Sequence, residues 1–396
     1  MAYLKFQADY IFTGTEMLQG NYVLITDEAG TIHDIVFTTE AGDDVQQFKG
    51  MLTPGFVNCH CHLELSHMQH VTETGTGLVD FLIAVIKQRN FPQEYIFEAM
   101  HRAEQELYNS GTVAVGDICN TTDTVSLKQK SKLQFYNFIE TIGFTETKAA
   151  ERFAFSKNIE EQFQSSIVNH QSSIVPHAPY SVSKSLFELV NNNASGKTLT
   201  IHNQESVAED ALYKTGISQF SKLYGALGID AGFFKASGKS SAQTYLPWVS
   251  NAKHLLLVHN TYISEEDIKM SKQQAATCNQ ELFYCLCVNA NLYIENKMPP
   301  IDLFRKNNCN IVMGTDSYAS NHSLNMLDEI KKTRHESAFS IPIAEILKWA
   351  TINGAKALQM DGILGSFEKG KRPGIVLIDE LTNEDISYKS AAKRII

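Results

Sequence analysis

The 396-residue sequence has no hydrophobic run long enough to span a membrane. A membrane-spanning helix needs ~18 or more consecutive apolar residues, whereas the most apolar early stretch, 77–86, is short and contains Asp80. The first residues, MAYLKFQADYIFTG, also lack the basic and then apolar order of a signal peptide. We therefore expect a cytoplasmic protein that has no membrane partner.

Basic residues are scarce relative to acidic ones. Lys and Arg total 34 and Asp and Glu total 44, which gives a formal net charge of −10. A nucleic-acid-binding protein usually carries a basic patch or stripe. The charge balance therefore argues against a nucleic-acid partner.

Cysteine is sparse, and its distribution does not favour disulfides. The seven cysteines are an odd number spread over a long chain, which predicts reduced thiols. Two close pairs, Cys59/Cys61 and Cys285/Cys287, are the places where a cysteine metal site has to be considered.

The middle of the chain has no short repeat and alternates short apolar runs with longer amphipathic stretches. Eight such runs are present, at 51–58, 112–118, 133–142, 172–178, 198–203, 254–260, 281–287 and 310–316. The stretches between them, such as 95–108 and 324–333, have helical spacing of apolar residues. This α/β pattern predicts a parallel sheet, most economically closed as a (β/α)8 TIM barrel. An open doubly wound sheet is the alternative, although no G-x-G-x-x-G follows the first strand.

The two ends of the chain differ from the middle. Residues 1–52 and 360–396 are typical of short strands separated by turns that contain Gly and Pro. We expect the two ends to form one small β-sandwich domain beside a barrel of residues 53–359. The segment 208–248 has two interpretations, a lid or pocket lining, or an ordinary helix followed by a loop.

Polar side chains with metal-binding chemistry follow the first apolar run. The run continues into Asn58-Cys59-His60-Cys61-His62. Side chains alternate along a strand, so the two histidines share one face and the two cysteines share the other. A four-ligand Cys/His zinc site would need all four to converge. We therefore predict that His60 and His62 point into the barrel mouth and that the cysteines pack outward against helices.

Three later runs end in His202, His259 and Asp316. In a TIM barrel these ends all lie at the carboxyl-terminal mouth, where active sites are found. Together with the first-strand pair, His202 and Asp316 give three imidazoles and one carboxylate, a set that suits Zn²⁺ or, as the alternative, Fe²⁺. The fourth run ends without a lysine that could bridge two metals. We therefore predict one divalent metal.

Two further residues follow strand ends. Glu205 comes three residues after His202, where it could turn back over the mouth and act as a general acid and base. The alternative is a glutamate that only stabilises a helix N-terminus. His177 ends the fourth run between two prolines, which suits either a held side chain or a loop cap.

Four motifs, in order along the chain, resemble those of the amidohydrolase superfamily. PGFVNCHCHLELSH resembles its first-strand motif, and His202-x-x-Glu205, LLLVHNTYIS and GTDSYASN resemble those of strands five, six and eight. HLELSH and PHAPYSVS are most similar to the aminofutalosine deaminase-like and methylthioadenosine/S-adenosylhomocysteine deaminase-like members, in the cytosine deaminase and chlorohydrolase branch.

The resemblance implies a role for each matching residue. The metal would be held by His60, His62, His202 and Asp316. Glu205 would be the proton shuttle, assisted by Asp316, and His259 would bond the attacking water or the developing oxyanion. His177 would contact the substrate, and Glu64 and Asn321, within the first and last motifs, are further candidate contacts. The strand-seven loop, 285–291, lacks the Pro and Ser of the family's CPxSN motif, so substrate contacts are not carried over from it.

These observations predict a metal-dependent hydrolase acting on non-peptide C–N bonds. The expected reaction is deamination of an aminated purine, nucleoside or related heterocycle by a metal-activated water. The same site could instead remove chloride or an amine from a triazine-like ring, or hydrolyse an amide or imine. A non-catalytic barrel scaffold is the third hypothesis. The expected partner is a small-molecule substrate, and a homodimer is left open.

Overall fold

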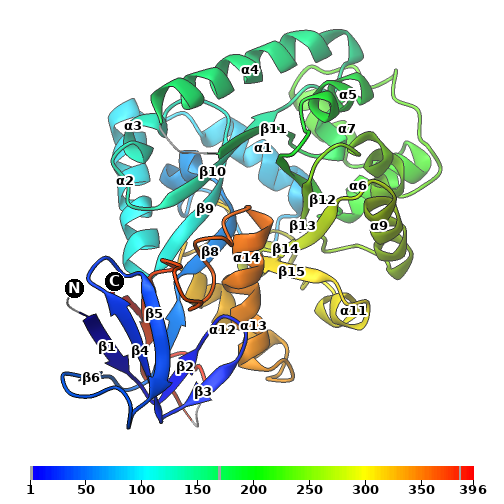
Figure 1. Cartoon of the computed structure of the whole chain (residues 1–396). Coiled ribbons are helices and arrows are strands. Elements are labelled where there is room, and N and C mark those ends of the chain that lie inside the picture. The colour runs from blue at the N-terminus through cyan, green and yellow to red at the C-terminus, as the bar shows by residue number, and fades with distance from the viewer. Residues whose placement is uncertain (1–2, 168–170, 383–384) are drawn as a thin grey trace.

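The computed structural model describes residues 3–167, 171–382 and 385–396, and eight parallel strands form its centre (Figure 1). Each strand overlaps one of the eight apolar runs. The strands are β8 (Phe56–Cys61), β9 (Thr112–Cys119), β10 (Gln134–Thr141), β11 (Gln171–Pro176), β12 (Thr198–Asn203), β13 (His254–His259), β14 (Glu281–Leu286) and β15 (Asn310–Met313). Most of their positions are buried on both faces, as expected when helices cover a parallel sheet.

The eight strands pair as two four-stranded parallel sheets, in the orders β11-β10-β9-β8 and β12-β13-β14-β15. The sheets meet at two places. At one, the amide of His202 donates a hydrogen bond of 3.0 Å to the carbonyl of His177. At the other, the amides of Thr315 and Asp316 both donate to the carbonyl of His60, at 3.1 and 2.9 Å. Both contacts lie at the carboxyl ends of the strands, so the residues that follow these ends surround one opening.

Helices connect consecutive strands and cover the sheets (Figure 1). They are α1 (Leu78–Gln88), α2 (Gln93–Asn109), α3 (Val125–Lys128), α4 (Ala149–Ser166), α5 (Lys184–Asn192), α6 (Val207–Thr215), α7 (Phe220–Ala226), α8 (Ser241–Tyr245), α9 (Glu265–Thr277), α10 (Val288–Glu295), α11 (Ile301–Lys306), α12 (Met326–Glu336), α13 (Ile343–Ala350) and α14 (Ile352–Ala357). Short 3₁₀ helices are η1 (Leu63–Met68), η2 (Glu146–Lys148), η3 (Pro179–Ser181) and η4 (Leu246–Trp248). The helix predicted at 324–333 begins only at Met326, because the side chain of Asn325 caps it by accepting the amide of Leu327.

The first apolar run, 51–58, is not one strand. It divides at Gly55 into β7 (Met51–Pro54) and β8. A Cβ at Gly55 would lie 2.2 Å from Val113 and 2.7 Å from the carbonyl of Pro373, so only glycine allows this close passage. The division sends β7 into a different sheet from β8.

Two further sheets are built from the ends of the chain, one from the N-terminal end alone and one from both ends. Their other strands are β1 (Tyr3–Gln7), β2 (Tyr10–Phe12), β3 (Met17–Gln19), β4 (Tyr22–Asp27), β5 (Ile32–Phe37), β6 (Gln46–Gln47), β16 (Ile375–Ile378) and β17 (Ala392–Arg394). The orders are β5-β4-β1-β6 and β17-β16-β7-β2-β3. The pairing of β7 with β16 joins the two chain ends in one sheet. Apolar side chains from both sheets, including Phe6, Leu52 and Ile375, share one core.

The segment 208–248 forms most of α6, all of α7 and α8, and η4. Phe220 of α7 shares an apolar cluster with Phe81 of α1, and Lys222 forms an ion pair with Asp80. No residue of this segment lines the pocket described below. The segment therefore packs against α1 and does not line the pocket.

All seven cysteines are free thiols, as predicted. Cys59 faces Gly354 of α14, where a Cβ would lie 3.1 Å from the Cys59 sulfur. Cys61 shares an apolar cluster with Leu107 of α2. Both thiols thus pack outward against helices. Within the described ranges, no helix combines the length and apolar character that crossing a bilayer requires.

Candidate active site

Two imidazoles leave the end of β8 side by side. The Nε2 atoms of His60 and His62 lie 3.1 Å apart, with the rings at 82° to each other. Oδ1 of Asp316 lies 3.3 Å from Nε2 of His62 and 3.7 Å from Nε2 of His60. The hydroxyl of Ser320 donates to the other carboxylate oxygen of Asp316 at 2.6 Å. The carboxylate is therefore held against both imidazoles.

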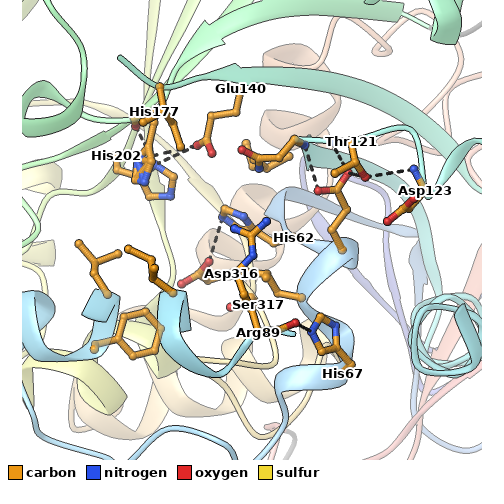
Figure 2. A pocket seen from close by; sticks show the side chains of 18 of the residues that line it. His62, His67, Arg89, Thr121, Asp123, Glu140, His177, His202, Asp316 and Ser317 are labelled. Atoms are coloured by element: carbon orange, nitrogen blue, oxygen red, sulfur yellow. Dashed lines mark hydrogen bonds and ion pairs between the residues drawn. The ribbon is translucent and has the colours of Figure 1, made fainter. Parts of the chain in front are cut away.

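His202 and His259, from the ends of β12 and β13, complete the cluster. Their ring centroids lie 4.8 and 5.8 Å from that of His60. One nitrogen from each of these three rings lies within 4.8 Å of the others, and the same limit holds for the set His60, His62 and Asp316. Figure 2 shows His62, His202 and Asp316 directed into one space. The structure thus brings together the five residues that the sequence placed at separate strand ends.

Burial controls the protonation of these imidazoles. Burial lowers the pKa of His62 and of His202 to about 3, and neighbouring imidazoles add to the effect. The same causes hold the pKa of His60 well below its usual value. The rings are therefore neutral and keep the lone pair with which imidazole binds a metal ion.

This donor set fits one divalent metal ion. The separations of 3.1, 3.3 and 3.7 Å among the Nε2 and Oδ1 atoms compare with roughly 3.3 Å between ligands that each lie ~2.0 Å from a tetrahedral ion. Lone pairs and a carboxylate that converge in a buried space repel one another unless a cation lies between them. The residues present are therefore suited to hold such an ion.

Glu205 lies beside this cluster and is buried, with 3% of its surface exposed. Its Oε1 is 3.7 Å from Nε2 of His259. Burial, reinforced by Asp316, raises the pKa of Glu205 well above its usual value. The preceding residue, Gln204, has a φ of +44°, and its side chain donates to Asp267 at 3.0 Å. This hydrogen bond helps to set the turn that brings the Glu205 carboxylate beside His259.

Sequence reasoning missed Glu140, at the end of β10. Its Oε1 lies 3.9 Å from Nδ1 of His177 and 3.8 Å from Nδ1 of His202 (Figure 2). The Nδ1 of His202 donates to the carbonyl of His177 at 2.8 Å, which leaves its Nε2 available to the cluster. Burial raises the pKa of Glu140, although His202 lowers it in part. The sequence did contain a signal for Glu140, because it lies near the end of the third apolar run. The other site residues were selected by the same criterion, a polar side chain near the end of a run.

The two remaining candidates differ in position. Glu64 lines the pocket, but its carboxylate accepts the amides of Asn120 and Thr121 at 3.0 and 2.9 Å. Burial raises the pKa of Glu64 to about 7. Asn321 is outside the lining, because its side-chain amide donates to the carbonyl of Thr315 and to Glu329, both at 2.8 Å. The structure therefore brings Glu64, but not Asn321, to the pocket.

The cluster lies at the polar floor of a pocket of about 370 Å³. Its outer wall comes from η1, α1, the α1–α2 connection and α2. It combines the polar side chains of His67, Arg89, Asn90 and Gln93 with the apolar ones of Leu65, Leu78, Phe81, Leu82, Ile86, Phe91 and Ile96. Several of these side chains, including Ile86, are partly exposed to solvent. Such a pocket suits a small molecule with a polar reacting end and an apolar extension.

Gly314 is expected to be essential to the first-strand histidines. A Cβ at Gly314 would lie 2.8 Å from both the backbone nitrogen and the Cβ of His60. We expect Gly314→Ala to displace His60, to lower the free energy of unfolding by about 1–3 kcal/mol and to reduce the bound metal. Chemical denaturation measures the change in the free energy of unfolding, and metal analysis measures the bound metal. Gly225→Ala is the matched control, because a Cβ there meets nothing within 4 Å; equal losses in the two variants would contradict the prediction.

Comparisons with known proteins agree with this geometry. The model of the amidohydrolase family matches residues 51–396. A 5-methylthioadenosine/S-adenosylhomocysteine deaminase of Thermoanaerobacter pseudethanolicus is 28% identical over 348 residues, 84% of this chain and 74% of that protein.

Two solved structures share the fold. The aminofutalosine deaminase of Helicobacter pylori in complex with methylthio-coformycin has a TM-score of 0.79 and 24% identity, over 99% of this chain and 100% of that one. An adenosine deaminase of Xanthomonas campestris with bound zinc has a TM-score of 0.69 and 20% identity, over 95% of this chain and 84% of that one. Since the family model covers most of the sequence, the chain belongs to the amidohydrolase family.

Proposed function

We propose that the protein catalyses the hydrolytic deamination of a purine nucleoside-like substrate, with one divalent metal ion held by His60, His62, His202 and Asp316. The observation that carries this proposal is a pair of ligand sets that share His60, one with His62 and Asp316 and one with His202 and His259. The buried carboxylate of Glu205 lies beside them. The family and the deaminases named among its relatives support the same reaction.

Zinc is our first choice for the ion, and iron(II) is the alternative, because both suit three imidazoles with one carboxylate. The structural neighbour from Xanthomonas campestris binds zinc. The chemistry that such an ion supplies when bound is Lewis acidity, which lowers the pKa of water from ~15.7 to about 7.

The protein's own side chains would move the protons. Glu205, with Asp316, takes a proton from the attacking water, and Glu205 delivers it to the ring nitrogen beside the carbon under attack. The second proton of the water goes to the amino group. A C–O bond forms, the C–N bond breaks, and the nitrogen leaves as ammonia. His259, 3.7 Å from Glu205, lies where it can bond the water.

The pocket lining supports a substrate with an apolar group beyond the reacting ring. Ile86 and Phe91 belong to the apolar part of the outer wall, while Glu64, Glu140 and His177 supply polar contacts nearer the floor. The relatives' names include 5-methylthioadenosine, and the Helicobacter pylori structure binds methylthio-coformycin. We therefore propose a purine nucleoside with an apolar 5′ substituent, bound through its sugar by these polar side chains.

We also propose that the eight central strands close into a (β/α)8 TIM barrel of residues 53–359, and that 1–52 and 360–396 form a small β-sandwich domain. The hydrogen bonds between the two four-stranded sheets, and the β7–β16 pairing, support this division.

A substrate panel tests the proposed function. We expect the purified protein to release ammonia from 5′-alkylthio-adenosines, with kcat/KM ~10-fold or more above that for adenosine. A chelator should reduce the release to background, and zinc or iron(II) should restore it. Chloride or alkylamine released from triazines, with no ammonia from any nucleoside, would contradict the proposal. Full activity in metal-free protein would do the same.

A further inference from the structure

The backbone at the end of β13 is held in an unusual conformation. His259 and Asn260 have φ values of +70° and +56°, a left-handed region that non-glycine residues seldom adopt. The amide of Asn260 donates to the carbonyl of Asn203 at 2.9 Å, and the side chains of these asparagines are bonded at 2.9 Å. Tyr245 donates to the same Asn203 side chain at 2.7 Å. Such strain, stabilised by buried hydrogen bonds, is typical of a functional position.

The imidazole of His259 is oriented by Asn291 on α10. Nδ1 of His259 lies 3.0 Å from Oδ1 of Asn291. The other ring nitrogen, Nε2, is buried, faces Glu205 at 3.7 Å and has no hydrogen-bond partner among the described residues. One side of the ring is therefore bonded to the protein, and the other is left for the pocket.

The remaining contacts of Asn291 determine which of its atoms faces His259. Its Nδ2 lies 2.6 Å from the hydroxyl of Thr261 and 3.4 Å from the carbonyl of His259. A backbone carbonyl can only accept a hydrogen bond, so the amino group of Asn291 points there. The carbonyl oxygen must then face Nδ1 of His259, which has to carry a proton in order to donate.

This contact comes from residues 285–291, the end of β14 and the beginning of α10, whose sequence departs from the family motif. No residue of 285–291 lines the pocket. Val288 and Ala290, near the missing Pro and Ser, are buried in the core. This segment therefore acts on the site through Asn291 and not through direct contact with the substrate.

We infer that Asn291 is a positioning residue that fixes the Nδ1–H tautomer of His259, so that Nε2 presents a lone pair to the pocket. His259 then accepts a hydrogen bond from the attacking water before the reaction, and can donate to an oxyanion only after it has taken up a proton. This inference deepens the proposed deamination and rests on it for the identity of the water.

The first test reads the tautomer directly. Long-range ¹H–¹⁵N NMR of the histidine-labelled protein distinguishes Nδ1–H from Nε2–H, and the His259 signal is assigned by its loss in His259→Gln. We expect the wild-type protein to have His259 in the Nδ1–H form. In Asn291→Leu we expect either the Nε2–H form or a mixture of the two tautomers. Nε2–H in the wild type would overturn the inference, whether or not the protein deaminates nucleosides. If Asn291→Leu does not fold, Thr261→Val removes the partner that orients the amide and is read in the same way.

The second test separates positioning from a general structural role. Asn291→Leu is expected to lower kcat by roughly 10–100-fold, with little change in KM or metal content. Asn291→Asp keeps an acceptor for Nδ1 and should retain more of the activity. Asn289→Leu is the matched control, because Asn289 lies two residues away on α10 and bonds Glu329 instead of the site. An equal loss in Asn289→Leu and Asn291→Leu, or no loss in the latter, would overturn the inference.

Discussion

Replacing Glu205 by glutamine is expected to lower kcat by roughly 10²–10⁴-fold while leaving metal binding intact. Glutamine has almost the same shape as glutamate, so the buried site beside His259 should keep its packing. It cannot take a proton from water and return it to the substrate. Steady-state ammonia release and metal analysis of the same preparation measure both effects.

Glu329→Gln provides the control for the Glu205 variant. Glu329 is also buried, and burial raises its pKa to about 7, but its carboxylate bonds Asn289 and Asn321 outside the pocket lining. The same chemical change there should leave kcat close to that of the wild type. Near-normal turnover by Glu205→Gln would remove Glu205 from its proposed role.

Replacing Lys128 by methionine is expected to lower the free energy of unfolding by about 3–5 kcal/mol. The Lys128 ammonium is fully buried and bonds Asp117 at 2.5 Å, Asn137 at 2.8 Å and Cys119 at 3.2 Å. Methionine would fill the space but leave the carboxylate of Asp117 without its counter-charge. Because Asp117 also accepts the amide of Leu63 at 2.9 Å, the turn after His62 should loosen as well. Chemical denaturation and metal affinity measure the two effects.

A double variant tests the electrostatic explanation for this loss. Asp117→Asn combined with Lys128→Met removes both charges and should recover much of the stability, since a buried ion pair is often replaceable as a unit. Our account would be contradicted if Lys128→Met alone lowered the free energy of unfolding by less than ~1 kcal/mol, which is the range of an exposed ion pair.

The part of the site that could be predicted from sequence follows from two geometric rules. Alternation along a strand placed His60 and His62 together, and the shared direction of parallel strands placed His202, His259 and Asp316 at the same opening. Both rules depend only on local spacing and on the order of the elements. They therefore needed no knowledge of how any side chain is bonded.

The remaining features depend on contacts between distant segments. Whether Glu140 faces the pocket depends on where β10 ends and on how close β11 brings His177. Asn321 stands in a matching motif, yet a bond to Glu329, on the following helix, directs its amide elsewhere. The division of the first run has one local signal, the Pro54-Gly55 pair that is typical of a turn. This signal does not show that β7 and β8 belong to different sheets, because both are apolar and differ in the strands with which they pair.

The pairing of β7 with β16 has a consequence for biosynthesis. Leu52 lies opposite Leu377 in this sheet, so more than 300 residues must leave the ribosome after β7 before its partner exists. The nascent chain meanwhile carries an unpaired strand edge, the kind of surface that promotes aggregation. The segment that carries the eight central strands lies between β7 and β16, so it can fold first and bring these two strands together. A nonsense mutation between Asp316 and Ile375 is therefore predicted to yield a chaperone-dependent polypeptide, even though every residue of the proposed metal cluster has already been translated.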